Sequence, residues 1–130
     1  MYRSKQKEDN IMLKRAMLFL VTILLASQSL AMGVQQGKAS YYHYNSPKVR
    51  LTANGEKFDS NKLTAAHKTL PFGTKVKVTN LKNNKSIIVR INDRGPFIKS
   101  RVIDVTKHGA EKLDFIKLGV VPVKLEVVKR

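Results

Sequence analysis

Apolar and polar residues alternate strictly along TKVKVTN (74–80), and in the neighbouring SIIVRIND (86–93) apolar residues occupy every second position from Ile87 to Ile91. A period of two residues places every second side chain on the same face, as in a strand with one buried and one solvated side. The intervening LKNNK (81–85) is mostly polar and contains two asparagines, which favour turns. The pattern therefore predicts a β-hairpin in this part of the chain.

Shorter apolar runs surround this hairpin. Further strands are predicted for KASYYHY (38–44), RVIDVT (101–106) and VVPVKLEVV (120–128). LTAAH (63–67) is a short run of small and apolar residues. HGAEKLDFIK (108–117) carries apolar residues at helical spacing and predicts one short helix, which ends at Gly119. Many short strands with one helix in about 95 residues are typical of a small closed β-barrel.

The first 31 residues have the pattern of an export signal. A positively charged Lys14-Arg15 pair precedes the apolar residues 16–26, and Ser29-Leu30-Ala31 places small residues where signal peptidase cleaves. The apolar run is shorter than the roughly 20 residues that a membrane-spanning helix needs. The alternative is an uncleaved N-terminal anchor. We expect a signal peptide in residues 1–31, a short linker in residues 32–36 and the folded domain in residues 37–130.

The chain is strongly basic, with 25 lysine and arginine residues against 9 acidic residues and a net charge of +16. The expected signal peptide contains five of the basic and two of the acidic residues, so the remainder keeps a net charge of +13. Such a charge favours anionic partners. The chain has no cysteine, which excludes disulfides, thiolate metal sites and a cysteine nucleophile. About 100 residues are enough to fold on a hydrophobic core alone.

The stretch SIIVRIND ends on a carboxylate. Continuing its alternation places Asp93 on the same face as the apolar Val89 and Ile91. Arg94-Gly95-Pro96 follows and predicts a turn away from the strand. A carboxylate on the buried side of a strand has either a structural role or a catalytic role.

Six segments match one protein family in the family's order. They are GKASYY (37–42), LTANGEKFD (51–59), LTAAHKTLPFGTKVKVTNL (63–81), VRINDRGPF (89–97), RVIDVT (101–106) and GVVPVKLEV (119–127). Together they span nearly all of residues 37–128. On these segments the chain resembles the rare lipoprotein A family, the septal-ring lytic transglycosylases. The resemblance implies a mainly β fold, a six-stranded double-psi β-barrel with one short helix.

The resemblance also implies an exported enzyme that cleaves the MurNAc–GlcNAc bond of peptidoglycan and leaves a 1,6-anhydromuramyl product. One carboxyl group then acts first as acid and later as base, whereas glycoside hydrolases normally use two carboxylates. By motif, the candidate catalytic residues are Asp93, Asp104, Glu56 and His67. The candidate substrate-binding residues are Tyr41, Tyr42, Thr52, Asn54 and Arg94. Burial beside apolar side chains disfavours a charged carboxylate, so Asp93 suits the proton donor. We expect no cofactor and no metal site.

Each candidate also has a purely structural explanation. Asp93 alternatively caps the following turn by accepting backbone N–H groups, and Asp104 alternatively pairs with Arg94 or Arg101. Glu56 follows the tight-turn signal Asn54-Gly55 and is alternatively a solvated turn residue. A lone His67 is alternatively a hydrogen-bonded structural histidine, and the tyrosines alternatively pack in the core.

Three classes of function remain in competition. The first is the peptidoglycan lytic transglycosylase. The second is a non-catalytic, expansin-like module that binds or loosens the cell wall. The third is a basic binder of nucleic acid or another anionic polymer, which the export signal disfavours. We expect a monomer that is secreted or lies in the periplasm or cell envelope. Its partners are glycan strands and anionic wall polymers, not nucleic acid, and it touches the membrane only through an uncleaved leader.

Overall fold

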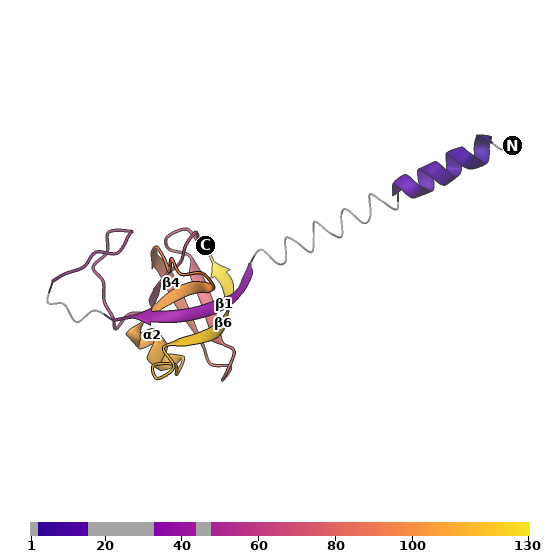
Figure 1. Ribbon diagram of the computed structural model, residues 1–130. Helices are drawn as coiled ribbons and strands as arrows, with labels where there is room; N and C mark the ends of the chain where they lie inside the picture. Colours follow the sequence, from indigo (N-terminus) through magenta and orange to yellow (C-terminus); the bar gives the residue numbers. More distant parts are fainter. Residues whose placement is uncertain (1–2, 16–32, 44–47) are drawn as a thin grey trace. The chain divides into compact units, whose positions relative to one another are not determined.

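The computed structural model describes residues 3–15, 33–43 and 48–130 (Figure 1). The chain divides into two units, Met1–Gly33 and Val34–Arg130. In the first unit, residues 3–15 are helical. The apolar run and cleavage site of the expected signal peptide lie outside the described residues. Among the helices that are described, none has the length and apolar character needed to cross a membrane.

The second unit is a closed barrel with the strand order β1-β5-β2-β4-β3-β6. Its elements are β1 (Val34–Tyr42), β2 (Thr64–Ala66), β3 (Lys75–Asn80), β4 (Ser86–Asp93), β5 (Arg101–Thr106), α2 (Lys107–Lys112) and β6 (Val120–Lys129). β1 pairs with β5 in parallel and with β6 in antiparallel orientation, and Figure 1 shows β1 and β6 side by side. The prediction of a six-stranded barrel with one short helix is confirmed for this unit.

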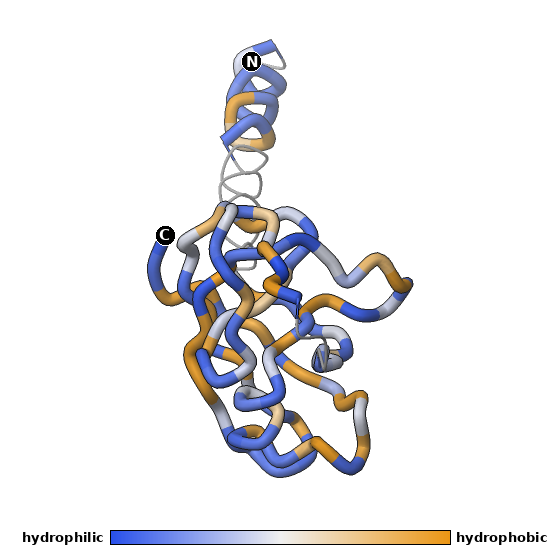
Figure 2. Tube along the Cα trace, turned by 90° about the vertical axis from the view of Figure 1, so that its left-hand side faces the viewer, coloured by the Kyte–Doolittle hydropathy of each residue, from blue (hydrophilic) through white to orange (hydrophobic). Residues whose placement is uncertain are grey.

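The core is built from the alternating strands. Val76 lies opposite Val89, and Val78 lies opposite Ile87, so the predicted hairpin of β3 and β4 is confirmed. All four side chains are buried, whereas the two lysines of β3, Lys75 and Lys77, are exposed. Figure 2 shows this alternation of hydrophobic and hydrophilic residues along the strands. The hydrophobic effect therefore fixes which face of each strand points inward.

Two element boundaries differ from the prediction. β1 pairs with β6 from Val34 onward, so residues 34–36, expected as a linker, belong to the barrel. α2 ends at Lys112, earlier than the predicted residue 117. Asp114 has a φ of 58°, a left-handed conformation that an α-helix does not accommodate and that commonly ends one. Leu113 is nevertheless buried, as the helical spacing predicted.

The short strand β2 lies between two strands that carry carboxylates. It pairs in parallel with β4 and in antiparallel orientation with β5. The register of β2 and β4 shifts at Ala66, which lies opposite Asp93, and Asn92 is the extra residue of β4. Such a bulge redirects the side chains that follow it. Ala66 also lies opposite Asp104 of β5, so the bulge places the two aspartates on either side of one alanine.

Candidate functional site

Asp93 and Asp104 line one small pocket of about 110 Å³, together with Tyr42, Arg50, Ala66 and Arg94. We call it the acid pocket. Two strand spacings of about 4.8 Å separate β4 from β5, so the backbones of the two aspartates are about 10 Å apart and their side chains converge on the pocket. The structure thus brings together two of the four candidate catalytic residues, Asp93 and Asp104. Within the described part of the chain, no three metal-binding side chains converge.

Asp93 is held by backbone donors on one of its two oxygens. The side chain is buried, and Oδ1 accepts the N–H groups of Ala53 and Arg94, each at 2.9 Å. Oδ2 lies 3.9 Å from the guanidinium of Arg50. The turn-capping contacts that were the structural alternative are therefore present. They all engage Oδ1, whereas the neighbour of Oδ2 is the Arg50 side chain. The strict alternation does not describe this position, because the Asn92 bulge pairs Asp93 with Ala66 rather than continuing the register of the strand.

Asp104 has one neutral donor. Its Oδ1 accepts the hydroxyl of Ser40, which lies opposite it in β1. Among the described residues, Asp104 forms no ion pair with Arg94 or Arg101. The salt bridge considered as the structural alternative is thus not formed there. Asp104 is half-buried, and its other oxygen is left for the pocket.

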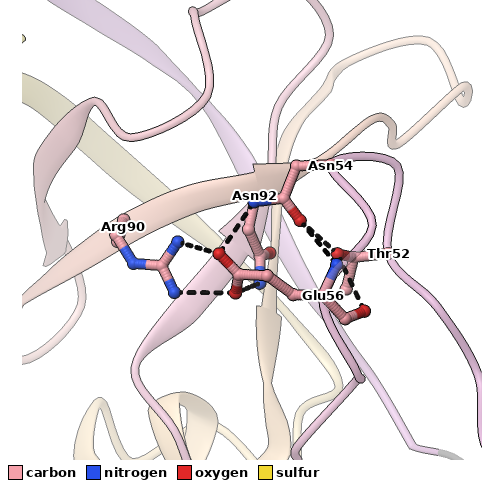
Figure 3. A network of polar contacts seen from close by, with 5 residues as sticks. All are labelled: Thr52, Asn54, Glu56, Arg90 and Asn92. Atoms are coloured by element: carbon pink, nitrogen blue, oxygen red, sulfur yellow. Dashed lines mark hydrogen bonds and ion pairs between the residues drawn. The ribbon is translucent and has the colours of Figure 1, made fainter.

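Glu56 does not line the acid pocket but lies in a network of five polar residues (Figure 3). Arg90 donates to both carboxylate oxygens, at 2.6 and 2.8 Å, and Asn54 and Asn92 donate at 2.8 and 3.2 Å. These hydrogen bonds, led by that of Arg90, lower the pKa of Glu56 from 4.5 to about 2. A carboxylate held charged at neutral pH is poorly suited to donate a proton. The geometry therefore favours a positioning role for Glu56.

The Glu56 network fastens the loop 51–57 to β4. The backbone N–H of Asn54 donates to the carbonyl of Asn92 at 3.2 Å, and the hydroxyl of Thr52 donates to the Asn54 side chain at 2.5 Å. The same loop supplies the Ala53 N–H that binds Asp93. Thr52 and Asn54, expected to bind substrate, thus use their side chains within the network and do not line the acid pocket.

His67 is buried and its ring is fully engaged. Nδ1 accepts the backbone N–H groups of Thr69 and Leu70 at 3.1 and 3.0 Å, which leaves Nε2 to donate to Gln35 Oε1 at 2.9 Å. Burial and, after it, the neighbouring cationic side chains lower the pKa of His67, so the ring is neutral at pH 7. These contacts match the structural alternative. Its backbone N–H donates to the carbonyl of Asp93 at 3.2 Å, so His67 orders the chain beside the acid pocket.

The two candidate tyrosines differ in position. Tyr42 lines the acid pocket, and its ring lies 4.9 Å from that of Phe58. Tyr41 packs edge-on against the buried Phe115 at 5.8 Å, and its hydroxyl donates to the carbonyl of Ile116 at 3.1 Å. Tyr42 therefore belongs to the candidate site, whereas Tyr41 belongs with the core.

Two arginines line the acid pocket. Arg94, expected to bind substrate, donates to the carbonyl of Leu70 at 2.8 Å and stacks over the ring of Phe72 at 4.0 Å. Arg50 was missed by the sequence analysis. It lies in a turn-rich stretch without periodicity, and only the closing of the barrel brings it beside Asp93. Ser40, the donor to Asp104, was also missed, because only the pairing of β1 with β5 places it opposite Asp104.

Comparisons with known proteins agree on the barrel. A double-psi β-barrel family model described as "Lytic transglycolase" matches residues 34–125. Two solved structures share the fold, each with a TM-score of 0.59. The Streptomyces papain inhibitor is 23% identical, covering 74% of this chain and 94% of that one. The expansin of Clavibacter michiganensis is 15% identical, covering 74% and 50%. At these identities the likeness establishes the double-psi fold alone.

Curated relatives are closer in sequence. The "Endolytic peptidoglycan transglycosylase RlpA" of Campylobacter jejuni is 56% identical over 79 residues, which cover 61% of this chain and 29% of that protein. The "Probable endolytic peptidoglycan transglycosylase RlpA" of Treponema pallidum is 51% identical over 110 residues, which cover 85% and 34%. The chain thus matches about a third of the length of these relatives. From the family model and these identities, the chain belongs to the lytic transglycolase family of double-psi β-barrels, the rare lipoprotein A family that its motifs resemble.

Proposed function

We propose that the protein is a peptidoglycan lytic transglycosylase that cleaves the MurNAc–GlcNAc bond and leaves a 1,6-anhydromuramyl end. The observation that carries this proposal is the convergence of Asp93 and Asp104 on one pocket, across Ala66. The names of the two bacterial relatives, which describe endolytic peptidoglycan transglycosylases, support the same reaction.

In the proposed reaction Asp93 is both acid and base. A proton on Oδ2 passes to the glycosidic oxygen while the bond between that oxygen and C1 breaks. The C6 hydroxyl of the same sugar then bonds to C1 and returns its proton to Oδ2, so no water is consumed. Arg50, at 3.9 Å from Oδ2, stabilises the carboxylate between the two transfers.

Asp104 has a different part in this mechanism. A positive charge develops on the sugar ring as the bond to C1 breaks, because the transition state resembles an oxocarbenium ion. A carboxylate that faces the same pocket stabilises that charge electrostatically. The hydroxyl of Ser40 keeps the Asp104 side chain oriented. Asp104 therefore complements Asp93 and does not replace it.

Glu56 and His67 act as positioning residues in this account. Glu56 holds the loop that donates the Ala53 N–H to Asp93. His67 holds the chain that follows β2 by accepting two backbone N–H groups. Neither side chain lines the acid pocket, so each acts through the placement of Asp93.

The location and partners follow from the proposed substrate. Peptidoglycan lies outside the cytoplasm, so we place the protein in the cell envelope, the periplasm or the medium. The signal-peptide pattern of residues 1–31 supports this placement. We propose a monomer that binds glycan strands, with anionic wall polymers as further partners that its basic charge favours.

Product analysis tests the proposed function. Purified sacculi are incubated with the protein, and the released fragments are analysed by mass spectrometry. We expect new fragments with anhydromuramyl ends, each lighter than the hydrolysed equivalent by one water. Fragments with reducing muramyl ends would identify a hydrolase. Binding to sacculi without any fragment release would identify the non-catalytic wall-binding module instead.

A further inference from the structure

A second and larger hollow, of about 510 Å³, lies beside the acid pocket. We call it the basic groove. Its charged lining residues are Lys48, Arg50, Lys57, Lys62 and Asp59. Arg50 lines the acid pocket as well, so the two hollows meet at this side chain. A chain molecule bound at Asp93 therefore lies next to a side chain that also lines the basic groove.

The lining of the basic groove carries four cations and one carboxylate. Lys57 and Lys62 are exposed, and neither belongs to an ion pair among the residues that the structure describes. Asp59 accepts the backbone N–H of Asn61 at 2.9 Å and is not ion-paired with a groove lysine in the described chain. The protein leaves an excess of positive charge in this hollow, and such a hollow attracts anionic ligands.

We propose that the basic groove binds carboxylate groups of the glycan strand next to the bond that is cleaved. This inference rests on the proposed function and names a second subsite for the same substrate. Every muramyl sugar carries a lactyl group, whose carboxyl is either free or extended by a peptide with carboxylates of its own. A strand whose scissile bond lies at Asp93 thus presents negative charge along its path past Arg50.

The side chains of the basic groove suit such a strand. Lysines are flexible point charges, and three of the four cations are lysines, so they can follow carboxylates that are spaced along a chain. Phe58 and Val49 add apolar surface to the lining, and Val49 is 70% exposed. Apolar and aromatic surface of this kind packs against the C–H face of a sugar ring. A separate phosphate-bearing polymer is the competing occupant. Unlike the substrate strand, such a polymer is not held at Asp93, next to Arg50.

A binding measurement with matched variants tests this inference. Lys57→Gln with Lys62→Gln removes two groove charges, and Lys82→Gln with Lys117→Gln removes two exposed charges outside both hollows. All proteins also carry Asp93→Asn, which keeps the probe intact. The probe is peptide-free glycan strands from purified peptidoglycan. The same strands with their carboxyls converted to methylamides, and a polyglycerol phosphate, are the comparison ligands.

We expect the groove variant to bind peptide-free strands about 3- to 20-fold more weakly, from two exposed charge contacts. The control variant should stay within about twofold, and the amidated strands should bind both variants alike. Equal weakening in the two variants would overturn the inference, because binding would then depend on the overall positive charge of the protein rather than on the basic groove. Undiminished binding of amidated strands, or a selective loss for polyglycerol phosphate, would also overturn it.

The outcome separates this inference from the proposed function. If sacculi release anhydromuramyl fragments but the groove variant binds normally, the proposed subsite is refuted and the proposed enzymatic activity is retained. If no fragments form but the groove variant selectively loses binding, the carboxylate-binding site is retained and the protein is a wall-binding module rather than an enzyme.

Discussion

The carboxylates of Glu56 and Asp93 both accept hydrogen bonds near β4, but they differ in exposure and in the type of donor. The Glu56 side chain is 39% exposed, but its carboxylate accepts four hydrogen bonds from side chains, two of them from Arg90. The Asp93 side chain is only 10% exposed. Its Oδ1 accepts two backbone N–H groups, and its Oδ2 lies 3.9 Å from the guanidinium of Arg50, beyond hydrogen-bonding distance. Among the described residues, the more buried carboxylate is thus the one with an oxygen that accepts no hydrogen bond.

This difference shows that burial alone does not identify a proton donor. Two short hydrogen bonds from the Arg90 guanidinium keep the Glu56 carboxylate charged, as its pKa of about 2 expresses. A carboxylate held by backbone groups on one side keeps its position while its other oxygen exchanges a proton. This difference supports the proposed division, in which Glu56 positions and Asp93 transfers the proton, and the following predictions test that division.

Asp93→Asn should have the largest effect on the rate of glycan cleavage. An amide keeps the shape and still accepts the N–H groups of Ala53 and Arg94, but it has no carboxyl proton to donate. We expect the rate of glycan cleavage to fall about 100- to 10,000-fold with an unchanged melting temperature. A rate within about threefold of the wild type would remove Asp93 from the chemistry and make Asp104 the candidate acid.

Asp104→Asn should have the next largest effect. The amide oxygen of the variant still accepts the hydroxyl of Ser40, so the fold should be retained, but the pocket loses a negative charge. We expect the cleavage rate to fall about 100-fold, the order found for removal of one electrostatic group from an active site. Single-turnover rates on soluble glycan strands measure this loss. A loss as large as that of Asp93→Asn would indicate that the two carboxylates act as one unit.

Glu56→Gln should lower stability in a pH-dependent way. The folded-state pKa of Glu56 is about 2 against an ordinary value of 4.5. Its stabilisation is therefore complete above pH 4.5 and is lost as the pH falls toward 2. Because more than a third of each partner in the Arg90 pair is exposed, solvent screens the pair. We expect about 1 kcal/mol at pH 7, or about 4–8 °C in melting temperature. Thermal melts from pH 7 to pH 2 should show the difference shrinking, and a constant difference would contradict the assigned pairing.

His67 should give the smallest effect, seen in the slope of stability against pH. Its folded-state pKa lies below 6.5, so the unfolded chain binds a proton that the folded ring does not. Stability should fall as the pH drops below 6.5, and His67→Gln should remove this part of the slope. His43→Gln, at an exposed position, is the control. An unchanged slope in His67→Gln would show that the ring is not held neutral.

The sequence predicts the parts of this molecule that depend on local pattern. The β3–β4 hairpin and the burial of Val76 and Val89 follow from alternation, because a strand with one buried face repeats every two residues. The bulge at Asn92 does not follow, since one extra residue leaves the apolar pattern before it unchanged. The strand pattern singled out Asp93 and the resemblance to the family added Asp104, but neither predicted their different donors.

The pairing of Glu56 with Arg90 also could not be predicted from the sequence. The two residues are 34 positions apart, and no periodicity links a turn residue to a strand residue. Arg50 likewise reaches Asp93 only through the closed barrel. Contacts that join distant segments depend on the topology, and the topology came from the resemblance rather than from local patterns.

The most direct test of the division between the two carboxylates is a double-mutant cycle on Glu56 and Arg90. The rate of anhydromuramyl formation is measured for Glu56→Gln, Arg90→Gln and the double variant. If Glu56 only positions the loop 51–57, each single change should cost about 10- to 100-fold, as a small misplacement of a catalytic group does. The double variant should then be no slower than either single variant. A Glu56→Gln protein as inactive as Asp93→Asn, beside an Arg90→Gln protein close to the wild-type rate, would contradict the account and make Glu56 the acid.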